Sequence, residues 1–131
     1  GALHYDPDWD TRPLWLLAAG TGLGPLFGVL REALRQDHQG DIRVIHLAHD
    51  AQGHYLAKPL QAMAASRPNL SVELWTPTEL PAALAQLRLV SRQTLALLCG
   101  GPDSVDAFAR RLYLAGLPRN QLLADVFLPR G

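Results

Sequence analysis

A glycine-rich run at residues 20–25, Gly-Thr-Gly-Leu-Gly-Pro, is the first segment of the chain whose residue types suggest chemistry. Glycines let a backbone approach a ligand closely, and the free N–H groups at a helix start favour an anion such as a pyrophosphate. The run does not fit G-x-G-x-x-G, which would need glycine at Pro25 or Phe27, nor a P-loop, because Lys58 is far away. It therefore predicts either a phosphate-binding turn or a tight turn that only packs a helix on a strand.

A second glycine-rich segment is Cys99-Gly100-Gly101-Pro102. A cysteine at the end of a strand and before a helix is placed where its thiol pKa can be lowered. A cysteine-dependent phosphatase would need an arginine soon afterwards, but Arg110 is the next one and the loop would be too long. The alternative is that Cys99 is a small apolar residue that closes a buried strand.

Three histidines and one aspartate lie in or after the expected second strand. His46 and His49 would point to different faces, and neither they nor His54 have a Cys or carboxylate at metal-ligand spacing, so we expect no metal site. There is no G-x-S-x-G elbow to indicate a Ser-His-Asp triad. Asp50 stands where an acidic residue can bind an adenosine ribose and repel a 2′-phosphate, although it can equally start the turn at residues 50–53.

The composition excludes several classes of protein. The chain has 131 residues, of which 48% are hydrophobic, and its 12 basic and 12 acidic side chains cancel. This predicts one globular domain with a core and offers no electrostatic basis for nucleic-acid binding. A single cysteine cannot form an internal disulfide, which favours a reducing, cytoplasmic compartment. The uncharged stretch 14–30 follows acidic residues and contains glycines and a proline at its centre, so we expect neither a signal peptide nor membrane insertion.

Short apolar runs alternate with segments of helical spacing along most of the chain. The expected strands are 14–19, 42–48, 70–76, 94–99 and 122–127. The expected helices are about 25–36, 56–64, 79–90 and 103–115. This alternation predicts an α/β fold, a doubly wound five-stranded parallel sheet with helices on both faces, over residues 14–128, with 1–13 as a lead-in. Ligands of such Rossmann-like sheets bind at the carboxyl ends of the strands, where both glycine-rich turns would lie.

These segments together resemble the C-terminal nucleotide-binding domain of the ferredoxin–NADP reductase superfamily over about residues 12–128. Residues 19–26 are similar to that family's G-T-G-(I/L)-(A/G)-P loop, and residues 98–102 are similar to its C-G-x-P motif. Residues 125–127, Asp-Val-Phe, resemble the acidic-x-aromatic ending of many members. All three motifs occur in the family's order and at similar spacing.

The resemblance implies that the chain positions the nicotinamide of NADH or NADPH for hydride transfer to a flavin. Cys99 would be the catalytic residue, close to nicotinamide C4 and helping to aim the hydride at flavin N5 by positioning rather than covalent attack. Members that use NADPH often have a basic residue after the second strand, so His49 and Asp50 favour NADH. The residues implied to bind the cofactors are Gly20, Thr21, Gly22, Leu23, Gly24, Pro25, His49, Asp50, Gly100, Gly101, Pro102 and Phe127.

Two features of the family are missing from the sequence: the flavin-binding β-barrel with its R-x-Y-(S/T) motif, and the four cysteines of an iron–sulfur cluster. We therefore expect FAD or FMN to be bound mainly by another domain of a longer parent protein, and any iron–sulfur cluster to occur only in that parent. The expected partners are this flavin domain and an electron acceptor such as a ferredoxin or iron–sulfur domain, and the isolated chain should be inactive. Two alternatives are a non-catalytic interaction module that kept the fold and a flavodoxin-like mononucleotide binder.

Overall fold

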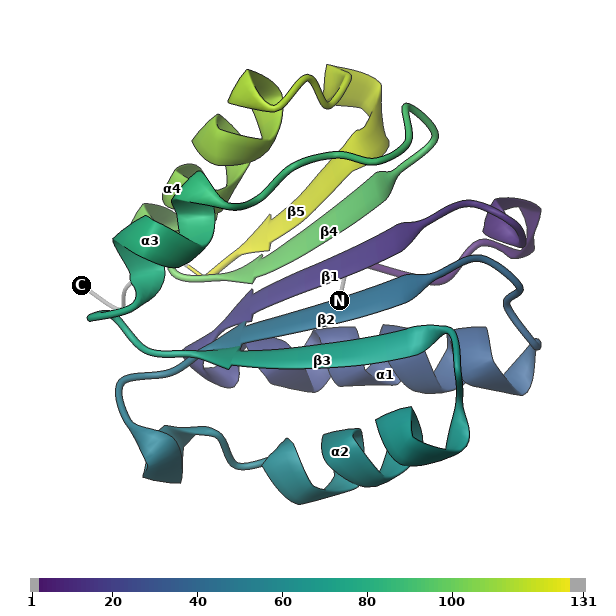
Figure 1. The fold of residues 1–131 in the computed structure, drawn as a ribbon, viewed down its shortest axis with the longest axis horizontal. Helices are drawn as coiled ribbons and strands as arrows, with labels where there is room; N and C mark the ends of the chain where they lie inside the picture. The colour runs from purple at the N-terminus through teal and green to yellow at the C-terminus, as the bar shows by residue number, and fades with distance from the viewer. Residues whose placement is uncertain (1–2, 128–131) are drawn as a thin grey trace.

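A parallel sheet forms the centre of the protein, which is described by a computed structural model over residues 3–127. The strand order is β3-β2-β1-β4-β5, and all four strand pairs are parallel (Figure 1). The strands are β1 (Leu14–Ala19), β2 (Ile42–Leu47), β3 (Leu70–Trp75), β4 (Leu95–Gly100) and β5 (Leu122–Val126). These bounds and the parallel pairing confirm the predicted fold class.

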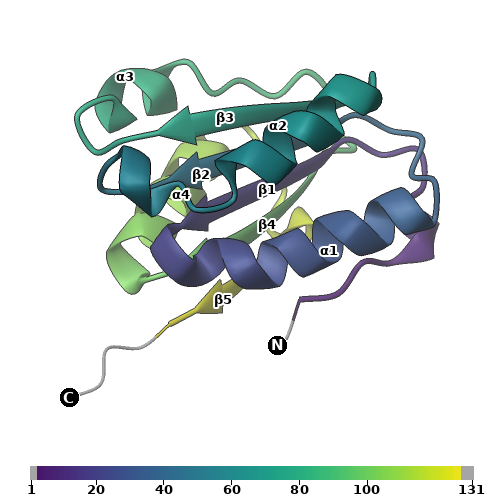
Figure 2. The ribbon, with the colours of Figure 1, turned by 90° about the horizontal axis from the view of Figure 1, so that it is seen from below.

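Helices cover both faces of this sheet (Figure 2). The helices are α1 (Leu23–Arg35), α2 (Ala57–Ser66), α3 (Leu80–Ala85) and α4 (Pro102–Leu114). Apolar side chains of α1 and α2 share one buried cluster with one face of the sheet, and those of α3 and α4 share a second cluster with the other face. The central strands β1 and β4 are apolar throughout because both of their faces are covered in this way.

The third helix is shorter than the sequence predicts. The spacing of apolar residues predicts a helix over residues 79–90, but α3 ends at Ala85, and Leu87 beyond it is fully buried. The guanidinium of Arg111 in α4 donates hydrogen bonds to the carbonyl oxygens of Ala85 and Leu87, both at 3.1 Å. Carbonyls at the end of a helix need partners outside it. Arg111 supplies them here, which no local pattern in residues 79–90 could indicate.

The first helix begins earlier than expected. Pro25 suits a first helical position, but α1 starts at Leu23, and Gly20–Gly22 form a 3-10 turn that leads directly into it. The uncharged stretch 14–30 therefore forms β1, this turn and most of α1. Within residues 3–127, no helix is both long enough and apolar enough to cross a membrane.

The segment before β1 packs against the rest of the molecule. Leu3 and Tyr5 are buried in the cluster that contains α1. The Tyr5 hydroxyl lies 2.7 Å from Nδ1 of the buried His38, and Nε2 of His38 lies 2.8 Å from the Arg12 carbonyl oxygen. Since a carbonyl only accepts, Nε2 is the donor, and Nδ1 accepts the hydroxyl proton of Tyr5. These bonds attach the expected lead-in to the end of α1.

Candidate functional site

The two glycine-rich turns meet at the carboxyl edge of the sheet, between β1 and β4. These strands are neighbours, with Ala18 paired to Cys99. From β1 the chain continues to β2 on one side of this pair, and from β4 it continues to β5 on the other side. Such a reversal of strand order is the place where ligands bind in open α/β sheets. The sequence predicts that both glycine-rich turns lie at the carboxyl edge of the sheet. The strand order, with β1 next to β4, brings the two turns together.

The contact between the turns depends on two glycines. A Cβ on Gly22 would lie 2.3 Å from the Cys99 carbonyl oxygen and 2.8 Å from the Gly100 nitrogen. Gly100 has a φ of +149°, and a Cβ there would lie 2.9 Å from Cβ of Ala19. A side chain at either position would therefore force the turns apart.

Two other glycines leave open space. A Cβ on Gly20 or Gly101 would meet no atom within 4 Å, although Gly20 has a φ of +57° that disfavours other residues. Thr21 and Gly24 are exposed, whereas Leu23 is buried in the core. The start of α1 has no side-chain cap, so its first N–H groups have no side-chain acceptor. The partial positive charge of this helix start favours an anion, while the Leu23 N–H itself donates to the Gly20 and Thr21 carbonyl oxygens.

A pocket of about 610 Å³ opens over these turns. Its lining residues are Ala19, Gly20, Thr21, Gly101, Pro102, Asp103, Ser104 and Phe127. A smaller pocket of about 180 Å³ shares three of them and extends toward the end of β2. Its lining residues are Ala19, Gly20, Leu47, Ala48, His49, Pro77 and Ser104. The two pockets are adjacent and together form the depression at the carboxyl ends of the strands, and the larger one is in the size range of cofactor sites.

Phe127 forms one wall of the larger pocket. Its backbone N–H donates a 2.7 Å hydrogen bond to the Gly100 carbonyl oxygen, which extends the pairing of β5 with β4 by one residue. Its side chain is 37% exposed. The aromatic ring is thus attached to the second glycine-rich turn and remains available at the surface.

Cys99 lies below the site rather than in it. Its side chain is fully buried in the cluster between the sheet and α1, and it lines neither pocket. Burial, assisted by the carboxylate of Asp125 on the adjacent strand, raises the pKa of the Cys99 thiol to about 11. The prediction that the thiol pKa of Cys99 is lowered is wrong, because the packing of α1 on the sheet excludes water from the thiol. The proximity of Cys99 to a nicotinamide stays a prediction.

His49 and Asp50 are separated by their surroundings. His49 is exposed and lines the smaller pocket. Asp50 lines neither pocket, and its Oδ1 accepts a 3.0 Å hydrogen bond from the Gly53 N–H. The carboxylate therefore starts the turn at residues 50–53, one of the two possibilities that the sequence left open. Its role toward a ribose stays a prediction.

The sequence does not indicate the roles of Asp103, Ser104 and His46 at the site. Asp103 and Ser104 line the pocket from the first turn of α4, and their position directly after Pro102 was the available signal. His46 was considered only as a metal ligand, yet its Nε2 lies 2.9 Å from the Gly20 carbonyl oxygen. No local signal predicts this contact, because residues 20 and 46 meet only when β1 pairs with β2. Among residues 3–127, no group of three His, Cys, Asp or Glu could hold a metal ion.

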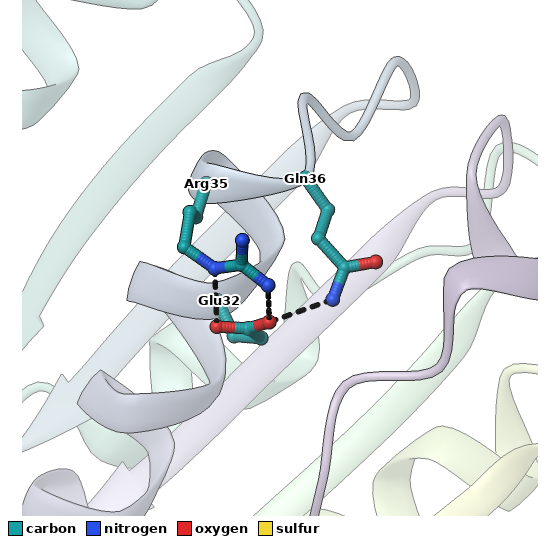
Figure 3. Close-up of polar contacts among 3 residues, drawn as sticks. All are labelled: Glu32, Arg35 and Gln36. Atoms are coloured by element: carbon teal, nitrogen blue, oxygen red, sulfur yellow. Dashed lines mark hydrogen bonds and ion pairs between the residues drawn. The ribbon is translucent and has the colours of Figure 1, made fainter.

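The carboxyl group with the largest pKa shift lies elsewhere. Glu32, near the opposite end of α1, accepts hydrogen bonds from Arg35 and Gln36, which lower its pKa to about 2 (Figure 3). Arg35 is exposed and Glu32 is half-buried, and all three residues lie at the carboxyl end of the helix. Such pairs three and four residues apart stabilise helices. Glu32 is therefore part of a surface ion pair and not a candidate acid or base.

Comparison with known proteins identifies the family of the chain. The family described as the oxidoreductase NAD-binding domain matches residues 16–85. The chain is 30% identical over 132 residues to the ferredoxin–NAD(P)(+) reductase component of the naphthalene 1,2-dioxygenase/salicylate 5-hydroxylase systems of Ralstonia sp., covering 92% of the chain and 40% of that protein. It is 30% identical over 117 residues to the ferredoxin reductase component of 3-ketosteroid-9-alpha-monooxygenase of Rhodococcus rhodochrous, covering 86% and 33%.

Solved structures share the fold. The cytochrome P450 reductase GcoB of Amycolatopsis superimposes with a TM-score of 0.78 at 23% identity, covering 94% of this chain and 40% of that one. The flavohem-like FAD/NAD-binding domain of nitric oxide dioxygenase from Vibrio cholerae superimposes with a TM-score of 0.76 at 22% identity. The match covers 90% of this chain and 52% of that chain. The chain spans less than half of the length of the two reductase components. On the match of the family to residues 16–85, the chain belongs to the oxidoreductase NAD-binding domain family.

Proposed function

We propose that this chain is the nucleotide-binding part of an NAD(P)H-dependent flavin oxidoreductase. The observation that supports this most strongly is the meeting of the two glycine-rich turns, with Gly22 against the Cys99–Gly100 peptide, beneath the depression at the carboxyl edge. The pyrophosphate would lie over Gly20 and Thr21, which line the larger pocket, near the positive end of the α1 dipole. The nicotinamide would lie toward the second turn and Phe127.

The residues present fit a nicotinamide nucleotide. Gly20 and Gly101 both line the larger pocket, and the space beside each Cα is open, so a ligand can approach the backbone there. Gly100 and Phe127 are joined by a hydrogen bond, which gives the nicotinamide end a wall of fixed position. When bound, the nucleotide supplies the hydride, and the chain contributes orientation and exclusion of water on this side.

The flavin would be bound mainly by another part of a longer protein. Two apolar residues at and just beyond the end of β5 are partly exposed: Val126 at 39% and Phe127 at 37%. Partly exposed apolar groups next to the nicotinamide wall are suited to contact with a flavin domain. The electron acceptor would be a ferredoxin or an iron–sulfur domain, in keeping with the two similar proteins, which are both ferredoxin reductase components.

NADH is the proposed nucleotide. Neither pocket at the carboxyl edge is lined by a lysine or an arginine, so nothing there would neutralise a 2′-phosphate. Asp50, next to His49 at the end of β2, would add repulsion of that group. Cys99 is proposed to support hydride transfer by shaping the turn beneath the nicotinamide.

Isothermal titration of the chain with NADH and with NADPH tests the proposal. We expect saturable binding of NADH and weaker binding of NADPH. The variant Gly101→Val should fold normally, because a Cβ there meets no atom within 4 Å, but should weaken NADH binding by filling the pocket. Gly28→Val in α1, another position with free space, is the matched control. No binding of either nucleotide at millimolar concentration would exclude this function, and equal or tighter binding of NADPH would exclude the proposed preference.

A further inference from the structure

His46 is a buried histidine that contacts the first glycine-rich turn. It lies on β2 between Ala18 of β1 and Leu74 of β3, and its side chain is fully buried. Nε2 is 2.9 Å from the Gly20 carbonyl oxygen. Because a carbonyl oxygen only accepts, Nε2 carries the proton and donates it to this bond.

The other nitrogen of the ring fixes the charge state. Nδ1 of His46 is buried and has no hydrogen-bond partner among the described residues. In a neutral ring Nδ1 is an acceptor, whereas in a charged ring it would be an unpaired N–H donor in the interior. Burial lowers the pKa of His46; the hydrogen bond to the Gly20 carbonyl oxygen opposes this shift, and the nearby His54 adds to it. The ring is therefore a neutral donor to Gly20.

Two neighbouring rings hold the imidazole in place. The ring of His54 packs edge to face on it at 5.1 Å, and the ring of Tyr55 does so at 5.8 Å. His54 is itself fixed, since its Nε2 lies 3.1 Å from the His46 carbonyl oxygen and 3.0 Å from that of Trp75. The direction of the donor toward Gly20 is thus determined by packing from residues that follow β2.

The bonded carbonyl belongs to the peptide that opens the turn. Gly20 has a φ of +57°, and its carbonyl oxygen also accepts from the Leu23 N–H within the turn. In a trans peptide the N–H points opposite to the C=O. A Gly20 carbonyl held toward His46 therefore directs the Thr21 N–H away from the interior, on the side where Gly20 and Thr21 line the larger pocket.

We infer that His46 is a positioning residue for nucleotide binding, which fixes the Gly20–Thr21 peptide so that the Thr21 N–H faces the pyrophosphate. This inference rests on the proposed function and deepens it. His46 does not touch the nucleotide. It connects β2 to the phosphate turn and keeps one of the donors of that turn oriented before the ligand arrives, which reduces the ordering that binding requires.

Three variants of His46 test the inference through the dissociation constant of NADH and the melting temperature. His46→Gln can place its amide N–H near the position of Nε2. His46→Asn places its amide N–H too close to the backbone to reach the Gly20 carbonyl oxygen, and His46→Leu removes the donor. We expect NADH binding to weaken about tenfold in the Leu and Asn variants, the effect of one lost hydrogen bond, and to be largely restored in the Gln variant. Tight binding by a folded His46→Leu protein, or equal losses in all three variants, would overturn the inference.

His38→Leu is the matched control for His46→Leu. His38 is also buried and donates through Nε2 to a carbonyl oxygen, but it lies beyond the far end of α1. This variant should lower the melting temperature while leaving the NADH dissociation constant unchanged. If the wild-type chain binds no NADH, the proposed function fails. If it binds and the His46 variants bind equally well, only the inference fails.

A measurement on the unaltered chain covers the case in which the variants do not fold. ¹⁵N spectra of the histidine rings at pH 7 should show His46 protonated at Nε2 only. Addition of NADH should shift the Thr21 amide resonance among the most strongly perturbed. A ring protonated at Nδ1, or a Thr21 amide that is unaffected by bound NADH, would contradict the inference.

Discussion

Gly22 lies against the backbone of Cys99, so closely that a Cβ on Gly22 would be 2.3 Å from the Cys99 carbonyl oxygen. The two residues are far apart in sequence. Gly22 lies shortly after β1, and Cys99 is the second-last residue of β4, the strand next to β1. Their contact joins the phosphate turn to the turn that carries the nicotinamide wall. The distance between the two halves of the site is therefore determined by backbone contact rather than by flexible side chains.

Replacing Gly22 by alanine should destabilise the protein. The methyl group would overlap backbone atoms that cannot move aside without separating β1 from β4, and overpacking of this kind costs about 1–3 kcal/mol. Urea denaturation measures the change in the free energy of unfolding. Gly28→Ala, at a position in α1 with free space, should instead stabilise by up to about 1 kcal/mol. Equal stability of the Gly22→Ala protein and the wild type would show that the turns are not held together by this contact.

The thiol of Cys99 should be unreactive in the folded protein. The thiol is fully buried, so a reagent cannot reach the sulfur, and its pKa is raised to about 11, so little thiolate is present at pH 8. Iodoacetamide labelling followed by mass spectrometry should show slow modification in buffer and rapid modification in urea. Labelling in buffer at the rate found in urea would mean that the turn opens and exposes the sulfur.

Stability should fall as the pH is lowered from 7.5 to 5.5. The pKa values of His38 and His46 are both lowered by burial, so the unfolded chain takes up protons at higher pH than the folded one. The contribution of the two neutral histidines to the free energy of unfolding is complete above about pH 6.5, the pKa of an unfolded histidine. It is lost as the pH falls below that value. Urea denaturation at pH 7.5, 6.5 and 5.5 measures this slope.

The slope should be smaller in His46→Gln, because that variant removes one of the two titrating groups. Glu32 does not contribute to this window, since its pKa moves from 4.5 to about 2 and its effect lies at lower pH. Stability that is constant from pH 7.5 to 5.5 would show that the two histidines are not held neutral.

Removal of the Tyr5 hydroxyl should loosen the segment before β1. The hydroxyl donates to Nδ1 of His38, and Tyr5→Phe would leave this buried acceptor without its partner, at a cost of about 1–2 kcal/mol. Hydrogen exchange should then increase in residues 3–12. Tyr113→Phe is the control, because within residues 3–127 the Tyr113 hydroxyl makes no hydrogen bond and its ring packs on Arg119. Identical stabilities of the two variants would show that the hydroxyl bond does not secure the segment.

Several features of the site were predictable because they depend on neighbours in sequence. Residues 14–19 and 94–99 are apolar runs followed by glycines, and such runs become buried strands that end in tight turns. In a sheet built by alternating strands and helices, all strand-to-helix turns fall on the same edge. The location of both glycine-rich turns at the carboxyl edge therefore follows from the order of residues along the chain.

The surroundings of individual side chains could not be predicted in this way. The position of Asp50 in the sequence allows a ribose contact or the start of a turn, and the fold adds a hydrogen bond from the Gly53 N–H to its carboxylate. Cys99 was considered for a lowered pKa, but α1 covers it and raises the pKa. Both outcomes depend on which groups surround a side chain after folding, and the sequence pattern around each residue does not specify those groups.

The sequence by itself determined the order of strands and helices, because hydrophobic period and turn residues act locally. It also determined which turns are rich in glycine and at which edge they lie. Only the tertiary structure decided that β1 lies next to β4, so that Gly22 meets Cys99. It likewise decided that His46 reaches the Gly20 carbonyl oxygen. Contacts of this kind are made across strands, and a strand's partners are chosen by burial over the whole sheet rather than by adjacent residues.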